Sequence, residues 1–133
     1  NIIGIRMGDK HFIPDFMSRI KENKFELYGW DDTRSFLSVS DAALAIHNLK
    51  NNNNALNKII NIGSDEEVKI IDVANMILKT IGKNKKIMLY DSPQGSVKRR
   101  VPDIKLLKSF IPNFPFTSID EEIKNMAVEY KLI

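Results

Sequence analysis

The stretch LYGWDDTRSFLSVSD, residues 27–41, decides how the rest of the chain is interpreted. It predicts a strand that ends at Gly29, a tight turn, a second strand opened by Arg34, and then a capped helix. An arginine at an ordered strand edge just after a turn can present its planar guanidinium to a phosphate or a carboxylate. The alternatives are a solvated side chain, or a weak ion pair with the acidic turn that precedes it. The stretch therefore predicts a candidate anion-binding position in a chain where strands and helices alternate.

Short apolar runs and helical patterns alternate on both sides of this stretch. We expect strands at residues 2–3, 25–28, 36–39, 58–62 and 86–90, and helices at 13–23, 40–50, 71–81, after 103 and after 118. Ser40 is the expected N-cap of the helix whose inward stripe is Ala42, Ala45, Ile46 and Leu49. Gly82 is expected to end the next helix, and Ser118 with Glu121 predicts a capping box for the last one. This order predicts the α/β fold class, as a small α+β-like layered domain spanning residues 1–133.

The composition is that of an ordinary globular domain with a real core, at 43% hydrophobic and 28% charged residues. The net charge of +3 is too small and too scattered to indicate nucleic-acid binding. The chain has no cysteine, which excludes a disulfide framework, a thiolate nucleophile and a Cys-based zinc site. Its two histidines lack metal-ligand spacing. No apolar run reaches the ~18 residues of a membrane helix, and we expect a cytoplasmic location.

The segment KRRVPD, residues 98–103, is a second candidate for anion binding. Arg99 and Arg100 lie in a loop with Gly and Pro immediately before an expected helix, where they can meet an anion. Asp103 can accept hydrogen bonds from a ribose diol. The alternative is that Asp103 caps the helix and the basic loop is solvated.

The segment MGDKHFIP, residues 7–14, is a candidate slot for a flat base. Its apolar members Phe12 and Ile13 can form the walls, and packing in the core is the alternative for both. His11 has no acidic residue and nucleophile arranged around it, so we expect no catalytic role for it.

Together these segments resemble the carboxy-terminal half of the nucleotide-sugar epimerases and dehydratases, the extended short-chain dehydrogenase/reductase family. Four blocks occur in the order and at the distances of that family: residues 1–14, residues 27–41, Ile60-Asn61-Ile62-Gly63, and Arg100-Val101-Pro102-Asp103. The chain departs from the family at Ile3-Gly4-Ile5, where Tyr-Gly-Pro is common, and at Ser38, where an aromatic residue is frequent. The resemblance covers nearly the whole chain.

The resemblance implies a set of substrate-binding residues for a nucleotide-diphosphate sugar. Arg34 and Arg100 would hold the diphosphate, Asp103 would contact the ribose, and Asn1 would reach the diphosphate or the sugar. The base would be walled by Phe12, Ile13 and Tyr28.

The resemblance also implies that the chemistry lies outside this chain. The six glycines form no Gly-rich turn for NAD(P), and no tyrosine is followed by a lysine at a spacing of four. We therefore expect no catalytic, cofactor-binding or metal-binding residues here, and an inactive fragment if it is taken alone. The parent would be an NAD(P)-dependent epimerase, dehydratase, decarboxylase or oxidoreductase of carbohydrate biosynthesis. The amino-terminal Rossmann domain of this parent is absent from the chain, and we expect that domain to be the chain's partner. Members of the family are commonly homodimers, so the resemblance also implies a homodimeric parent.

Two other functions fit the same residues. The chain can be a stand-alone module that binds nucleotide sugars without turnover. It can also be a structural or interaction domain in which the arginines are solvated.

Overall fold

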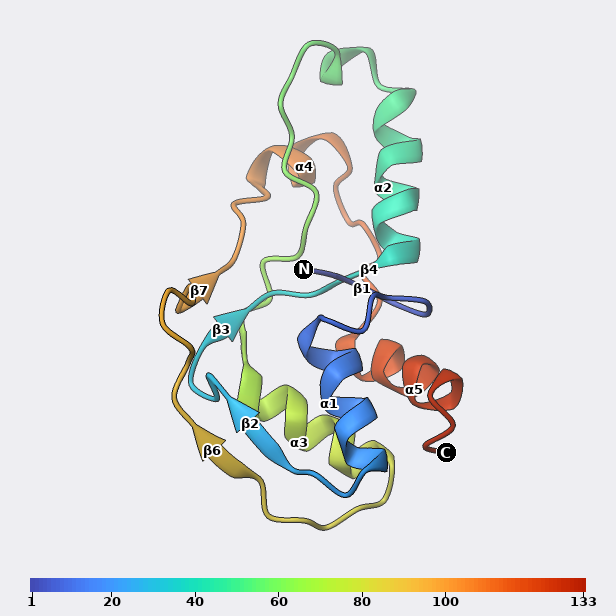
Figure 1. Ribbon diagram of the computed structural model, residues 1–133. Helices are drawn as coiled ribbons and strands as arrows, with labels where there is room; N and C mark the ends of the chain where they lie inside the picture. Colours follow the sequence, from blue (N-terminus) through green and yellow to red (C-terminus); the bar gives the residue numbers. More distant parts are fainter.

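The computed structural model describes residues 1–133 as five α-helices, one 3-10 helix and seven short strands (Figure 1). The elements follow in the order β1 (Ile2–Ile3), α1 (Phe12–Lys21), β2 (Glu26–Tyr28), β3 (Thr33–Arg34), β4 (Leu37–Ser38), α2 (Val39–Lys50), η1 (Asn53–Ala55), β5 (Val68–Lys69), α3 (Ile70–Thr80), β6 (Met88–Tyr90), β7 (Arg99–Arg100), α4 (Lys105–Phe110) and α5 (Ile119–Glu129). No helix is both long enough and apolar enough to cross a membrane.

The strands form three small sheets rather than one. β1 pairs with β4 and β2 pairs with β6, both in parallel. The third sheet has the order β5-β3-β7, in which β3 is antiparallel to β5 and parallel to β7. Each of these pairings joins segments that lie far apart along the chain, so the three sheets fix where the loops between them run (Figure 1).

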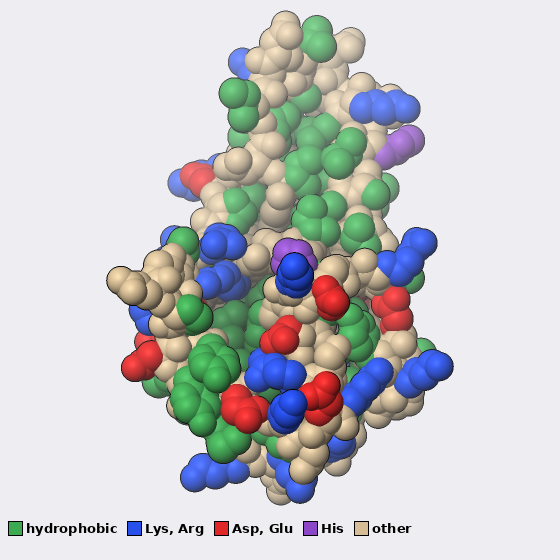
Figure 2. Space-filling view, in the orientation of Figure 1, with side chains coloured by type: hydrophobic (Ala, Val, Ile, Leu, Met, Phe, Trp, Pro, Cys, Tyr) green, Lys and Arg blue, Asp and Glu red, His purple; other side chains and the backbone are tan.

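The main core lies where α1, α3 and α5 meet (Figure 1). Each helix presents apolar residues three or four positions apart to the other two, because that spacing places them on one face. The completely buried members include Phe16, Met17, Ile20, Val73, Ile77, Ile123 and Met126. A smaller cluster, formed by Ala45, Leu49, Ile104 and Leu107, joins α2 to α4 above this core. Figure 2 shows apolar side chains gathered along this upper part of the molecule.

The helices agree with the periodicity of the sequence, with corrections at α2. The helix begins at Val39, and its cap is Ser38 rather than Ser40, because the Ser38 hydroxyl accepts the Ser40 N–H at 3.1 Å. Ile46 is 56% exposed, contrary to the predicted stripe. Only one side of α2 packs against the rest of the protein, and Ala42, Ala45 and Leu49 occupy that side.

The predicted helix ends are confirmed elsewhere. Gly82 has a φ of +66° and follows the last residues of α3, where the Lys83 N–H bonds back to the Leu78 carbonyl at 2.9 Å. Ser118 caps the start of α5 by accepting the Glu121 N–H at 3.3 Å, which is one of the two hydrogen bonds of the predicted capping box; the reciprocal bond from the Ser118 N–H to the Glu121 carboxylate is not formed.

The strand predictions contain two errors. Residues 58–62 do not form a strand, because this segment makes no ladder pairing with another strand, and Ile59 is 96% exposed. β5 and β7 were not predicted as strands. Each is two residues long and exists only through its pairing with β3, so neither leaves a periodic pattern in the sequence.

Candidate functional site

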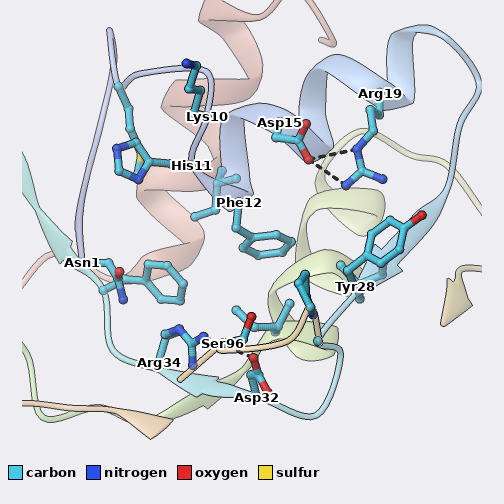
Figure 3. A pocket seen from close by; sticks show the side chains of 17 residues that line it. Asn1, Lys10, His11, Phe12, Asp15, Arg19, Tyr28, Asp32, Arg34 and Ser96 are labelled. Atoms are coloured by element: carbon cyan, nitrogen blue, oxygen red, sulfur yellow. Dashed lines mark hydrogen bonds and ion pairs between the residues drawn. The ribbon is translucent and has the colours of Figure 1, made fainter. Parts of the chain in front are cut away.

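A cavity of about 410 Å³ opens between α1, the turn after β2, β3 and the loop at residues 93–96 (Figure 3). Five of the seven predicted site residues line it: Asn1, Phe12, Ile13, Tyr28 and Arg34. They come from four segments of the chain that the sheets and α1 bring together. The cavity mixes apolar walls with cations and two carboxylates, Asp15 and Asp32, each of which is paired with an arginine. This lining suits a ligand that has a flat part and an anionic part.

Arg34 lies on the floor of the cavity, with its side chain 14% exposed. Its Nη1 donates to the carbonyls of Thr33 at 2.8 Å and Lys98 at 3.2 Å, and its Nη2 donates to Asp32 Oδ2 at 3.2 Å. A guanidinium has five N–H donors, so the Nε–H and one Nη2–H remain without a partner in the chain. The acidic-turn ion pair and the anion-binding position are therefore compatible, because the ion pair orients the guanidinium and leaves donors free.

Asp32 is the residue that sequence analysis missed. It is 4% exposed, and besides Arg34 it accepts the Ser92 hydroxyl at 2.8 Å and has the Lys98 ammonium at 3.4 Å. These contacts join the turn after β2 to the loop that precedes β7. Although desolvation acts to lower it, the pKa of Lys98 is raised by the hydrogen bond to Asp32 and by the charges of the neighbouring carboxylates. The pairing of Asp32 with Arg34 is local and matches the ion pair with the acidic turn, but Ser92 and Lys98 lie about 60 positions away along the chain, so no local pattern indicated those two contacts.

Gly29 is required by the same arrangement. Its φ is +64°, and a Cβ at this position would lie 2.8 Å from Asp32 Oδ2 and 2.9 Å from Ser92 Oγ. The turn can therefore close over the buried carboxylate only with glycine here.

Arg100 lies directly beside Arg34. The two residues are register partners on the parallel strands β7 and β3, so their side chains leave the sheet on the same face, roughly 5 Å apart at their Cβ atoms. The Arg100 side chain is exposed and makes no hydrogen bond or ion pair within the chain. Arg99 points to the opposite face, where its guanidinium holds Glu67 at 2.8–3.0 Å. Of the two adjacent arginines, only Arg100 is available beside Arg34.

Asn1 lies close to both arginines. Its side-chain amide donates to the Ser35 carbonyl at 3.0 Å, and it lines both the main cavity and a neighbouring hollow that contains Arg100. Both cations therefore act on the same small region.

The predicted base walls differ in character. Ile13 is 1% exposed and belongs to the main core, so the core-packing alternative also holds for it. Phe12 is half-buried and stacks on Phe16, with ring centroids 6.0 Å apart. Tyr28 is 54% exposed at the mouth of the cavity. Figure 3 shows Phe12 and Tyr28 on the side of the cavity where Asp15 and Arg19 form an ion pair, 2.8 Å apart.

Asp103 is not among the residues that line the cavity. Its Oδ1 accepts the Lys105 N–H at 2.9 Å at the start of α4, and its carbonyl accepts the Asn61 side-chain amide at 3.1 Å. The Asp103 carboxylate thus accepts an N–H of the first turn of α4, close to the alternative proposed for it, although the N-cap position itself is occupied by Ile104.

No family model matches the chain. The chain is 26% identical over 128 residues to UDP-glucuronic acid decarboxylase 1 of Xenopus tropicalis, and 27% identical over 134 residues to that of Danio rerio. These matches cover 95% and 98% of this chain, but 30% and 31% of the relatives. The chain thus spans about a third of the length of the curated relatives it matches.

Solved structures match the whole fold. A UDP-glucuronic acid 4-epimerase from Bacillus cereus, in complex with UDP-glucuronic acid and NAD, matches with a TM-score of 0.87 at 21% identity, covering 98% of this chain and 43% of that one. A dTDP-glucose 4,6-dehydratase from Bacillus anthracis in complex with NAD matches with a TM-score of 0.84 at 23% identity, covering 98% and 42%. A UDP-N-acetylglucosamine 4-epimerase from Methanobrevibacter ruminantium, in complex with UDP-N-acetylmuramic acid, matches with a TM-score of 0.84 at 20% identity, covering 99% and 44%.

The fold is that of the carboxy-terminal part of the extended short-chain dehydrogenase/reductase enzymes, so the predicted fold class is confirmed. Within that class, the predicted resemblance to the NAD-dependent nucleotide-sugar epimerases and dehydratases is confirmed, with sequence similarity to UDP-glucuronic acid decarboxylases.

Proposed function

We propose that this chain is the substrate-binding part of an NAD(P)-dependent nucleotide-sugar epimerase, dehydratase or decarboxylase. The observation that carries the proposal is the pairing of Arg34 and Arg100 as register partners, with Arg34 in the main cavity and Arg100 in the neighbouring hollow that Asn1 also lines. Arg34 has two free N–H donors in a fixed plane, and Arg100 has no partner of its own. The cavity beside them supplies Phe12, Ile13 and Tyr28 for the base.

The charges of this site fit a diphosphate. A diphosphate brings two negative charges into a partly dry cleft, where each charge-assisted hydrogen bond contributes about 1.5–3 kcal/mol. Two arginines on one face of a sheet repel each other in the absence of an anion, and an anion bound between them relieves that repulsion. Asn1 lies between the arginines and would reach the diphosphate or the sugar. The ribose role of Asp103 requires its carboxylate to leave the Lys105 N–H.

We assign the chemistry to a part of the parent protein outside this chain. NAD(P), bound there, would accept hydride from the sugar, as the complexes of the similar structures with NAD support. The residues of this chain would bind the nucleotide, orient the sugar and exclude water. The parent is proposed to work as a homodimer.

We propose that this part of the parent protein is a Rossmann domain, and that it contacts the surface around β1 and α2. β1 and β4 form a two-stranded parallel sheet, and parallel sheets are normally covered on both faces. Here Ile2 is 51% exposed and Ile46 of the adjoining helix is 56% exposed.

Isothermal titration calorimetry with UDP, GDP, CDP and dTDP tests the proposal on this chain and on the parent protein. We expect Arg34→Ala and Arg100→Ala each to weaken binding of the preferred nucleotide by at least tenfold, since each removes a charge-assisted contact. Arg99→Ala is the matched control, because Arg99 points to the opposite face, and it should leave the affinity within about twofold.

The outcomes separate the candidate functions. Unchanged nucleotide affinity in both variants of the parent protein would support the structural or interaction domain. It would contradict diphosphate binding by Arg34 and Arg100. Binding by this chain alone, lost in both variants, would favour a module that binds nucleotide sugars without turnover. Turnover of a nucleotide sugar by this chain with added NAD would refute the assignment of the chemistry to the missing part.

A further inference from the structure

The strand β6 has an open edge that the proposed function does not use. It pairs with β2 on one side and with no other strand. Its three residues Met88, Leu89 and Tyr90 are apolar and 44–47% exposed. Tyr90 also stacks on Tyr28 across the pair, with ring centroids 5.1 Å apart. Figure 2 shows apolar side chains gathered at the lower left, where Figure 1 places β2 and β6. An unpaired apolar edge of this kind is a template for another strand.

The backbone directions of β6 define which groups are available. The Met88 N–H donates to the Phe25 carbonyl at 2.9 Å, and the Tyr90 carbonyl accepts the Gly29 N–H at 3.0 Å. Backbone groups of an extended strand alternate in direction, so the N–H and C=O of Leu89 point away from β2. Those of Ile87, two positions earlier, have the same direction and make no backbone hydrogen bond. Ile87 and Leu89 are therefore the two residues that can pair with an added strand.

The sequence around β6 is complementary to itself in one register. It reads KKIMLYD, residues 85–91, with lysines at one end and an aspartate at the other. An antiparallel copy centred on Met88 places Ile87 opposite Leu89 and Lys85 opposite Asp91, twice by symmetry. Ile87 and Leu89 would then exchange four hydrogen bonds, which is the pattern of hydrogen-bonded pairs in an antiparallel ladder. A parallel copy would instead place lysine beside lysine.

We propose that β6 is a self-association surface, on which a second copy of this chain adds its own β6 in antiparallel register about Met88. The product is a four-stranded sheet with the order β2-β6-β6-β2 and a two-fold axis at Met88. Lys86 lies opposite Tyr90 of the second copy, beside the stacked Tyr28. A contact of three-residue strands buries less than about 1,000 Å², so the association is weak and depends on concentration.

Charge inversion tests the register. Sedimentation equilibrium from micromolar to millimolar concentration should detect a monomer–dimer equilibrium for the unmodified chain. Lys85→Asp and Asp91→Lys should each weaken it by roughly tenfold, because two attractive pairs become repulsive. An equimolar mixture of the two variants should form heterodimers, and the double variant K85D/D91K should regain the original dimerisation.

A backbone variant provides a second test. The Leu89 N–H points away from β2, so Leu89→Pro removes an intermolecular donor without breaking a hydrogen bond inside the chain. We expect loss of dimerisation with an unchanged circular dichroism spectrum. A chain that stays monomeric up to millimolar concentration would overturn the proposal, as would association that the charge variants and their mixture do not change.

Discussion

Substitution of Asp32 is the most informative perturbation of the candidate site. Asp32→Ala removes a carboxylate that is 4% exposed and that three side chains contact: Arg34 at 3.2 Å, Ser92 at 2.8 Å and Lys98 at 3.4 Å. The Lys98 side chain is 67% exposed, so solvent screens its ion pair and it adds little. The remaining contacts decide the cost of the substitution.

The cost can be worked out contact by contact. The neutral hydrogen bond to Ser92 contributes about 1 kcal/mol, and the charged one to Arg34 contributes about 1.5–3 kcal/mol. Arg34 is 14% exposed, so some of its charge remains unpaired in a partly desolvated position after the substitution. We expect a loss of about 3 kcal/mol in the free energy of unfolding, measured by urea denaturation.

Asp31 offers a matched control. It is the same residue type one position earlier, but its side chain is 48% exposed and only Lys98 lies nearby, at 3.5 Å. Asp31→Ala should change the free energy of unfolding by less than about 0.5 kcal/mol. The double variant D32A/R34A should lose less than the sum of the two single variants. If Asp32→Ala costs no more than Asp31→Ala, or if the two single losses add, the buried network does not hold Arg34 as described.

Two further predictions concern residues that contact the segment of Asp32 and Thr33. Gly29→Ala should lower the free energy of unfolding by about 1–3 kcal/mol in urea denaturation, because its φ of +64° and the 2.8 Å approach to Asp32 strain any Cβ; an unchanged midpoint would contradict this. The hydrogen bond from Arg99 lowers the pKa of Glu67 from its ordinary value of 4.5, so this group stabilises the fold above pH 4.5 and loses that contribution as pH falls through its folded-state pKa. Glu67→Gln should therefore flatten the acid limb of stability against pH, and an identical acid limb in both proteins would argue against the contact.

The sequence predicted the helices better than the strands for a physical reason. α1, α3 and α5 carry enough turns for a stripe of apolar residues to appear, and their packing buries that stripe. β3, β5 and β7 are two residues long, and their positions depend on which segment lies beside them. The apolar run at residues 58–62 had the composition of a strand but found no partner.

Some features of the candidate site could likewise be predicted from the sequence, and others could not. The residue types of the two arginines and the walls of the cavity were visible in the sequence, because chemistry can be inferred from residue type and nearby turns. The pairing of Arg34 with Arg100, and the opposite direction of Arg99, depend on the register between β3 and β7. The role of Asp32 depends on Ser92 and Lys98, which reach it through the fold.

The two arginines of the site differ in whether a neighbouring carboxylate offsets their charge. Asp32 offsets the charge of Arg34, and Glu67 offsets that of Arg99. Arg100 alone keeps an uncompensated charge on this face of the sheet. Under the proposed function, Arg34 therefore contributes mainly geometry, because its guanidinium is already held in one plane. Arg100 contributes most of the electrostatic attraction, and its side chain loses its freedom only when the anion binds.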